Sequence, residues 1–307
     1  MNRFISLLLF AILSLWLPAI SSHAQPVSIT DSLGVHHFDE SPTRIITLPW
    51  SITEMLLELK VTPLGVAGIE DYKKWVARPE IPQAVFDIGS RNEPNIERIA
   101  ELKPDLIVIS FQQRDLIETL SAIAPVLYFE TFSASHNNYQ TSKDIFIRLA
   151  KLLNRERFAI QRLSSMDKRV SELRAELQKH FKGEIPKVTP IRFNNTALAW
   201  IYGENSMPQY ALELLGIQPG LPQPNSQWGI TQKKVIELGR VNEGAVLHFL
   251  PYEQADTLFS TPLWRAMPFV RKNKFAAVRP TWTYGGPVSV LYLAEAMTAS
   301  LLSIHSN

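Results

Sequence analysis

Short apolar runs alternate with segments of helical periodicity along the first half of the chain. After an opening segment without a predicted element (26–42), the pattern predicts strands at 44–48, 63–67, 105–110 and 126–130, and helices at 52–60, 96–103 and 115–124. Ser51 and Glu54 fit a capping box for the first of these helices. Alternating strands and helices are typical of βαβ units, which predicts a mostly parallel sheet covered by helices.

The second half repeats this pattern. It predicts strands at 187–193, 197–202, 245–250 and 275–279, and helices at 207–215, 233–241, 263–270 and 288–304. A long irregular segment precedes one helix in each half, at 68–94 and at 219–231. Glu97 and Glu237 both follow an isoleucine, and each lies nine residues before the next predicted strand. These correspondences favour two related lobes.

Residues 141–181 lie between the two halves and contain neither proline nor glycine. Apolar residues recur there at spacings of three and four, as one stripe of a helix requires: Leu163, Met166, Val170, Leu173 and Leu177. An ordinary surface helix of a single domain would show the same stripe, but the similar flanks favour a spine between two lobes. We therefore predict an α/β protein with two Rossmann-like lobes, mostly parallel sheets and one long backbone helix. The expected boundaries are 1–24 for a signal peptide, 25–140 for the first lobe, 141–182 for the spine and 183–307 for the second lobe.

The first 24 residues have the pattern of a secretory signal. Arg3 precedes an apolar run at 4–20, and the small residues Ser22 and Ala24 follow it. An uncleaved anchor is the alternative, but small polar residues follow the run instead of a basic stop signal. The chain has no cysteine, which excludes disulfides, thiol catalysis and lipid attachment to a cysteine. We expect an exported protein without a stable membrane anchor in the periplasm of a Gram-negative bacterium.

Charge and motifs argue against several functions. The formal net charge is +2, which gives no electrostatic footprint for nucleic acid. The sequence has neither a G-x-S-x-G nucleophile turn nor a glycine-rich phosphate loop. His248 lies in a predicted buried strand, and His36 and His37 would point to opposite faces of an extended segment, which is poor geometry for one metal. We expect a protein that is not an enzyme and has no cofactor.

Aromatic residues at strand ends and in turns are the main sign of a binding site. Ligands of parallel α/β sheets bind beyond the carboxyl ends of the strands, where such turns gather. Arg91 is the charged residue that we expect in the same cleft, because a guanidinium offers five fixed donors to clustered oxygen atoms. Two alternatives stay open: each ring fills its own loop, and Arg91 pairs with Glu93 at the surface. The aromatic candidates are Trp50, Trp75, Trp228, Trp282 and Tyr284.

Five segments of the chain resemble one known family: 71–75, 87–95, 102–105, 261–270 and 282–285. They are similar to the periplasmic binding proteins of iron-siderophore ABC importers, and among these to the ferric hydroxamate-binding proteins. The resemblance covers about residues 40–300. It implies two α/β lobes bridged by one long helix, a shallow cleft and little hinge motion. It also implies a monomeric receptor that passes an iron(III)-hydroxamate siderophore to an inner-membrane ABC permease and its ATPase.

The resemblance assigns roles to individual residues. Arg91 matches the arginine that donates hydrogen bonds to the hydroxamate oxygens, and Gln113 falls where the family has a tyrosine that also reaches them. Trp75, Trp228, Trp282 and Tyr284 match positions in the aromatic wall. Glu97 and Glu237 match the glutamates that meet arginines of the permease, although exposed helix charge is the simpler interpretation.

Three other ligands remain possible for this architecture, namely a catecholate siderophore, heme and cobalamin. A triscatecholate complex carries negative charge and would require several cations, whereas only Arg91 is evident. A secreted α/β hydrolase is the alternative from a different class.

Overall fold

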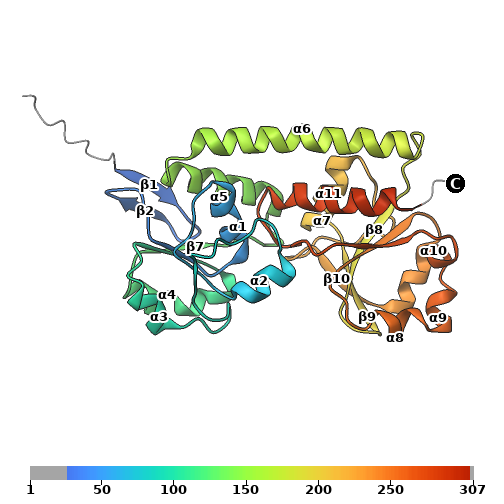
Figure 1. Cartoon of the computed structure of the whole chain (residues 1–307), viewed down its shortest axis with the longest axis horizontal. Coiled ribbons are helices and arrows are strands. Elements are labelled where there is room, and N and C mark those ends of the chain that lie inside the picture. The colour runs from blue at the N-terminus through green and yellow to red at the C-terminus, as the bar shows by residue number, and fades with distance from the viewer. Residues whose placement is uncertain (1–25, 305–307) are drawn as a thin grey trace, which may run out of the picture.

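Two α/β lobes lie side by side beneath one long helix in the computed structural model, which describes residues 26–304 (Figure 1). The predicted signal segment, 1–24, lies outside these residues, as does its expected boundary with the first lobe. No helix in the described part of the chain is long and apolar enough to cross a membrane.

The first lobe contains a fully parallel five-stranded sheet. Its strand order is β5 (Phe86–Asp87), β4 (Gly65–Val66), β3 (Ile45–Thr47), β6 (Leu106–Ser110) and β7 (Val126–Phe129). The alternating pattern predicts four of these strands, and the fifth, β5, lies in the segment expected to be irregular. Every residue of β3, β6 and β7 is buried, which explains why these strands are continuous apolar runs instead of alternating ones.

A hairpin that the sequence pattern did not predict precedes this sheet. It pairs β1 (Val27–Thr30) with β2 (Val35–Phe38), and the buried Asp31 in its turn accepts a hydrogen bond from the N–H of Tyr128 in β7. The two histidines of β2 contact different residues, as expected for side chains on opposite faces of a strand. His36 contacts Asp31, whereas His37 contacts Ser28. Among residues 26–304, no group of three or more His, Asp or Glu side chains could hold a metal ion.

The helices of the first lobe are α1 (Trp50–Glu58), α2 (Ile69–Trp75), α3 (Ile96–Glu101), η1 (Phe111–Leu116) and α4 (Ile117–Ser121). Two predictions were wrong here. Pro49, not Ser51, is the N-cap of α1, so the proposed capping box does not form. The segment 68–94 is not wholly irregular, because α2 forms within it after Gly68, which adopts a left-handed conformation at φ 64°.

The second lobe contains a mixed sheet of five strands. Its order is β10 (Ile230–Lys234), β9 (Leu198–Tyr202), β8 (Val188–Phe193), β11 (Ala245–Phe249) and β12 (Phe275–Val278). β11 is parallel to both β8 and β12, but β9 is antiparallel to β8 and to β10. Strand β10 was missed, because Lys233 and Lys234 are not apolar and the pattern divided this segment between a loop and a helix.

The helices of the second lobe are α7 (Met207–Leu215), η2 (Val235–Arg240), α8 (Ala255–Phe259), α9 (Pro262–Arg265), α10 (Pro268–Arg271) and α11 (Ser289–Leu302). The predicted bounds of α7 are confirmed, and Gly216 ends this helix in a left-handed conformation at φ 74°. The single helix predicted at 263–270 is two short helices, because Pro268 starts a second one.

The spine consists of two helices, α5 (Asn138–Leu152) and α6 (Glu156–His180), instead of the single helix predicted from 141 to 181. The break falls at Asn154, which has φ 55°. Asparagine tolerates this conformation better than most residues, so a helix can end there without glycine.

α6 has 25 residues, which gives a rod of about 37 Å at 1.5 Å per residue. Figure 1 shows it running above both lobes. The predicted stripe is buried on it at Met166, Val170, Leu173 and Leu177.

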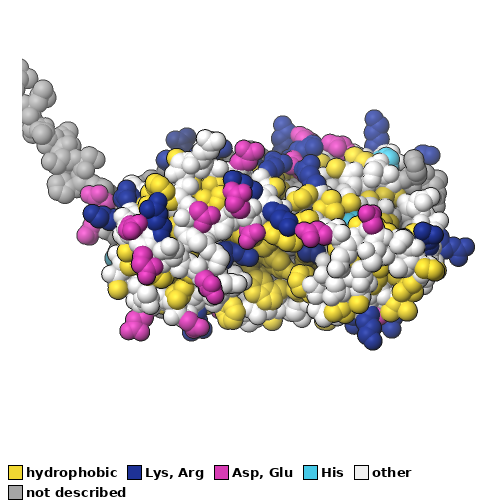
Figure 2. All heavy atoms as spheres, turned by 60° about the horizontal axis from the view of Figure 1, so that its bottom comes forward, with side chains coloured by type: hydrophobic (Ala, Val, Ile, Leu, Met, Phe, Trp, Pro, Cys, Tyr) yellow, Lys and Arg dark blue, Asp and Glu magenta, His cyan; other side chains and the backbone are white. Residues whose placement is uncertain are grey.

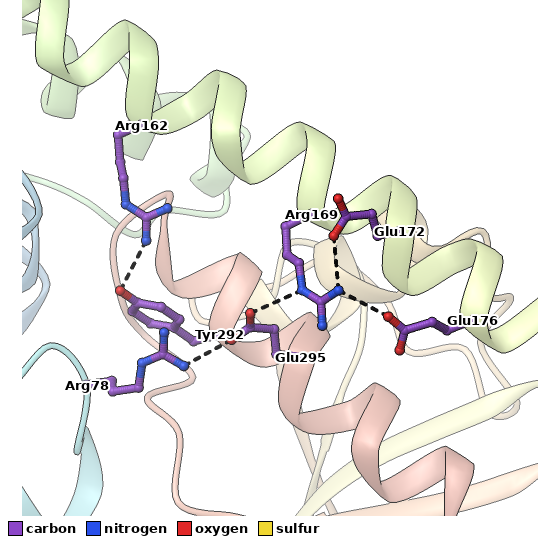
Figure 3. A network of polar contacts seen from close by, with 7 residues as sticks. All are labelled: Arg78, Arg162, Arg169, Glu172, Glu176, Tyr292 and Glu295. Atoms are coloured by element: carbon purple, nitrogen blue, oxygen red, sulfur yellow. Dashed lines mark hydrogen bonds and ion pairs between the residues drawn. The ribbon is translucent and has the colours of Figure 1, made fainter.

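A polar network fixes the rod to both lobes (Figure 3). Arg162 of α6 donates to Glu58 of α1 at 2.6 Å and to the Tyr292 hydroxyl of α11 at 3.2 Å. Glu295 of α11 binds Arg78, from the loop after α2, at 3.0 Å and lies 3.6 Å from Arg169 of α6. The first lobe, the rod and the last helix are therefore held by shared side chains.

His248 is a packed core residue of β11, as the apolar strand predicts. It is 3% exposed and stacks on Phe275 with ring centroids 4.9 Å apart. Burial, aided by the nearby Arg192 charge, lowers the pKa of His248 to about 4.

This pKa predicts a dependence of stability on pH. The unfolded state takes up a proton near pH 6.5 and the folded state only near pH 4, so stability falls as pH falls between these values. We expect a loss of about 2 kcal/mol from this group between pH 6.5 and 4.5. Urea unfolding across this range should show the loss in the wild type and a flatter profile in His248→Phe. Equal profiles for the two proteins would contradict the buried neutral state.

Candidate functional site

A pocket of about 270 Å³ lies between the two lobes. In Figure 2, apolar side chains gather in the hollow between the lobes, while charged side chains lie around it. The first lobe contributes Pro49, Trp50, Ser51, Arg91, Ser110, Gln112, Thr131 and Phe132, and the second contributes Trp228, Ile230, Trp282 and Tyr284.

Most of these residues follow the carboxyl end of a parallel strand. Trp50 comes after β3, Arg91 after β5, Gln112 after β6 and Phe132 after β7. In the second lobe, Trp282 and Tyr284 come after β12. This is the edge at which ligands bind in open α/β sheets. The fold therefore brings together five of the seven predicted ligand-binding residues: Trp50, Arg91, Trp228, Trp282 and Tyr284.

The Arg91 guanidinium stacks on aromatic rings. Its central carbon lies 3.7 Å from the centre of the Trp50 ring and 5.5 Å from that of Trp282. Within residues 26–304 this guanidinium makes no hydrogen bond or ion pair, so the predicted alternative of a pair with Glu93 does not form. Partial burial lowers the pKa of Arg91, and the charge of Asp71 opposes this change. The side chain thus offers unused N–H donors to the pocket.

Gln113 does not line the pocket as predicted. It is 1% exposed, and its side-chain amide donates to the Arg91 carbonyl at 2.9 Å. Its side-chain oxygen accepts from the N–H and hydroxyl of Ser110, both at 3.2 Å. The neighbouring Gln112 is the residue that faces the pocket. Gln113 therefore fixes the loop that carries Arg91 against the end of β6.

We expect Gln113→Leu to destabilise the fold by about 1–3 kcal/mol, because it leaves the Arg91 carbonyl and the Ser110 donors without partners. Ligand affinity should fall as well, since the Arg91 loop loses its support. Urea unfolding and ligand titration measure the two effects. Gln112→Leu is the matched control and should leave stability within about 0.5 kcal/mol. Equal stability losses in the two variants would contradict the supporting role of Gln113.

The aromatic rings of the pocket form one connected group. Trp50 meets Trp282 with centroids 5.0 Å apart, and Trp282 meets Tyr284 at 5.3 Å. Tyr284 in turn meets Trp228 at 5.6 Å, and Phe132 of the first lobe stacks on Trp228 of the second at 5.2 Å. The group thus includes rings from both lobes. Phe132 was missed by the sequence analysis, although its position just after a buried strand was a usable signal.

The turn that carries Trp282 and Tyr284 is attached to the first lobe. Glu54 of α1 is buried and accepts a hydrogen bond from the N–H of Gly286 at 3.2 Å. Burial raises the pKa of Glu54 well above its usual value, and the hydrogen bond from Gly286 opposes this rise. The neutral carboxyl is favoured, which suits a group placed between two apolar cores.

Trp75 does not line the pocket, contrary to the expectation. It is the last residue of α2, and its half-buried ring packs against the cluster of Trp50, Tyr72 and Val76. The ring also faces Arg192 of the second lobe, whose guanidinium carbon lies 5.3 Å from the ring centre. Trp75 therefore lies at the contact between the lobes, behind the pocket wall.

Glu97 and Glu237 lie in different surroundings. Glu97 is an exposed residue in the first turn of α3. Glu237, in η2, accepts from the N–H of Lys234 at 3.2 Å and lies 3.9 Å from the Lys233 ammonium group. Glu97 is the more available of the two for an external partner.

Two lobes joined by a long helix, with an aromatic pocket at the strand ends between them, define a substrate-binding protein of the helical-backbone class. The chain belongs to the periplasmic binding protein family, whose model matches residues 45–281.

Similar proteins include receptors for iron chelates. The chain is 31% identical to the iron(3+)-hydroxamate-binding protein FhuD of Escherichia coli K12 over 258 residues, which are 83% of this chain and 86% of that protein. It is 46% identical to FhuD of Vibrio cholerae, solved with Fe³⁺-Desferal bound, with a TM-score of 0.84 over 86% of this chain and 99% of that one.

A catecholate-siderophore binding protein of Vibrio cholerae, VctP, is 18% identical with a TM-score of 0.67. The match covers 90% of this chain and 99% of that one. At this identity the likeness shows the shared fold alone.

Proposed function

We propose that this protein captures iron(III)-hydroxamate siderophores in the pocket between its lobes and delivers them to an ABC permease of the inner membrane. The observation that carries this proposal is Arg91, a guanidinium with unused donors that stacks on Trp50 in a pocket lined by five aromatic residues. The relatives named for iron-hydroxamate binding support the same ligand class.

The chemistry of such a ligand fits the residues of the pocket. Iron(III) in the complex is already held by six siderophore oxygens, so the protein needs donors for polarised oxygens and apolar walls for the organic arms. The pocket lining includes Arg91 and several rings but no carboxylate. A tryptophan that loses about 150 Å² of apolar surface to a ligand contributes about 4 kcal/mol before ordering costs.

Transport rather than catalysis is part of the same proposal. The relatives are substrate-binding proteins, and the siderophore complex is the cargo rather than a cofactor. We propose export to the periplasm of a Gram-negative bacterium by the signal segment at 1–24, and contact of Glu97 and Glu237 with permease cations. The exposed first turn of α3 supports this role for Glu97.

Tryptophan fluorescence provides the test, because four of the rings near the pocket are indoles. Ferric desferrioxamine should quench the emission with a dissociation constant in the micromolar range or below. Metal-free desferrioxamine is the control and should bind far more weakly, because the metal holds the chelator in its compact shape. A ferric triscatecholate is the comparison for the alternative ligand class, and tighter binding of this complex than of ferric hydroxamates would favour that alternative. Absence of binding to several ferric hydroxamates would overturn the proposal.

A further inference from the structure

We propose that Arg192, buried behind the Tyr284 wall, is a second cation of the site and makes it favour ferric hydroxamates with neutral or negatively charged outer groups over those with a positive charge. The inference rests on the proposed function and adds the charge of the preferred ligand.

Arg192 is a buried charge without an acidic partner. The residue is 5% exposed in strand β8. Its Nε donates to the Tyr202 hydroxyl and its Nη1 to the Leu250 carbonyl, both at 3.2 Å. Its Nη2 has no hydrogen-bond partner among residues 26–304. No ion pair in the described part of the chain includes Arg192, so its charge is not neutralised by a contacting carboxylate.

Two carboxylates at the contact between the lobes already pair with other cations. Glu253 of the second lobe pairs with Lys74 at 3.2 Å. Glu295 pairs with Arg78 at 3.0 Å. The pocket lining itself contains no acidic residue. The positive charges of Arg91 and Arg192 therefore act together on whatever occupies the space between the lobes.

A short chain of contacts leads from Arg192 to the pocket. The Tyr202 hydroxyl, which accepts from Arg192, also lies 2.9 Å from the Thr283 hydroxyl. Thr283 stands between Trp282 and Tyr284, which both line the pocket. The ring of Tyr202 is 6.5 Å from that of Tyr284. The charge thus lies about one layer of side chains behind the wall.

The surroundings of Arg192 also reduce screening by water. Its guanidinium carbon lies 5.3 Å from the Trp75 ring and 5.7 Å from the Phe249 ring. Charges separated by aromatic side chains rather than by water interact more strongly than in solution. We expect each unit of ligand charge to change the affinity by about threefold to tenfold at low salt.

Ferrioxamine B provides a test in which the iron centre stays constant. Its terminal amine gives the complex a charge of +1, acetylation of that amine gives 0, and succinylation gives −1. For the wild-type protein we expect affinity to rise in this order, and the differences to shrink in high salt. Isothermal titration calorimetry at two salt concentrations measures both effects.

Three variants assign the charge effect to Arg192. Arg192→Met keeps a similar volume without the charge and should reduce the affinity ratio between the succinylated and free-amine complexes by at least threefold. Arg192→Lys should retain most of this ratio. Arg265→Met removes an exposed arginine from α9 of the same lobe and should leave the ratio unchanged. Thermal unfolding checks that each variant is folded; if Arg192→Met does not fold, the salt dependence and Arg192→Lys decide.

The outcomes separate the two proposals. Failure of all three complexes to bind the wild type would overturn the proposed function. Tight binding with equal affinities for the three, or an unchanged affinity ratio in Arg192→Met, would overturn the role of Arg192 alone. A purely structural role would lower all three affinities by the same factor and would likewise reject the inference.

Discussion

Replacing Arg91 with alanine is expected to weaken the binding of ferric desferrioxamine by about 100-fold to 1,000-fold. The guanidinium has no hydrogen bond or ion pair with residues 26–304, so its donors are available to the ligand. Each hydrogen bond from a charged donor contributes about 1.5–3 kcal/mol, and two such bonds near the lower end of this range, about 3–4 kcal/mol together, give the expected loss. Fluorescence titration and calorimetry measure it.

The same substitution should change fold stability by no more than about 1 kcal/mol, because the side chain is held mainly by its stacking on Trp50. Arg91→Lys should recover only part of the affinity, since an ammonium group lacks the planar fork of donors. Arg98→Ala is the matched control, because Arg98 lies nearby in α3 and pairs with the exposed Glu101. A loss of less than tenfold in Arg91→Ala would place the ligand elsewhere.

Glu58→Ala is expected to lower the free energy of unfolding by about 3 kcal/mol. Glu58 of α1 accepts hydrogen bonds from Arg162 of α6 and from the Tyr292 hydroxyl of α11. Its removal leaves a partly buried cation and a hydroxyl without their acceptor, and breaking a buried pair from one side costs about 3–5 kcal/mol. The expected loss of about 3 kcal/mol is at the lower limit of this range, because Arg162 is partly exposed.

Urea unfolding, followed by circular dichroism and fluorescence, tests this expectation. Glu172→Ala is the control, because Glu172 binds Arg169 on the exposed face of the same rod (Figure 3). It should change stability by about 0.5 kcal/mol or less, as exposed ion pairs do. A similar, small change in both variants would show that the junction of the three helices contributes little to stability.

The sequence predicted most strands of the fold, because a strand buried on both faces must be apolar throughout. It predicted the rod less well. The stripe of Met166, Val170, Leu173 and Leu177 is buried as expected, but the break at Asn154 carries no proline or glycine. Strand β10 was mistaken for part of a loop and a helix, because Lys233 and Lys234 are not apolar. Its antiparallel pairing with β9 depends on long-range contacts that local pattern does not contain.

The pocket residues were predictable where they depend on strand order, and less so where they depend on side-chain direction. Arg91, Trp282 and Tyr284 follow strand ends, so the rule for parallel sheets places them together. Trp75 was misplaced because α2 was not foreseen, and this helix turns its ring toward Arg192. Gln113 and Gln112 are neighbours on a 3₁₀ turn, and only the fold decides which of them faces inward. Arg192 was missed, although a single arginine within a buried apolar strand is an unusual feature.

The last helix completes the core of the first lobe. Val288 and Tyr292 belong to the same buried cluster as Ile52 and Met55 of α1, and every residue of α1 is buried. During synthesis, the first lobe therefore lacks this part of its core until almost the whole polypeptide has left the ribosome. For a chain that we propose crosses a membrane as an extended thread, a core completed this late favours an open polypeptide during translocation.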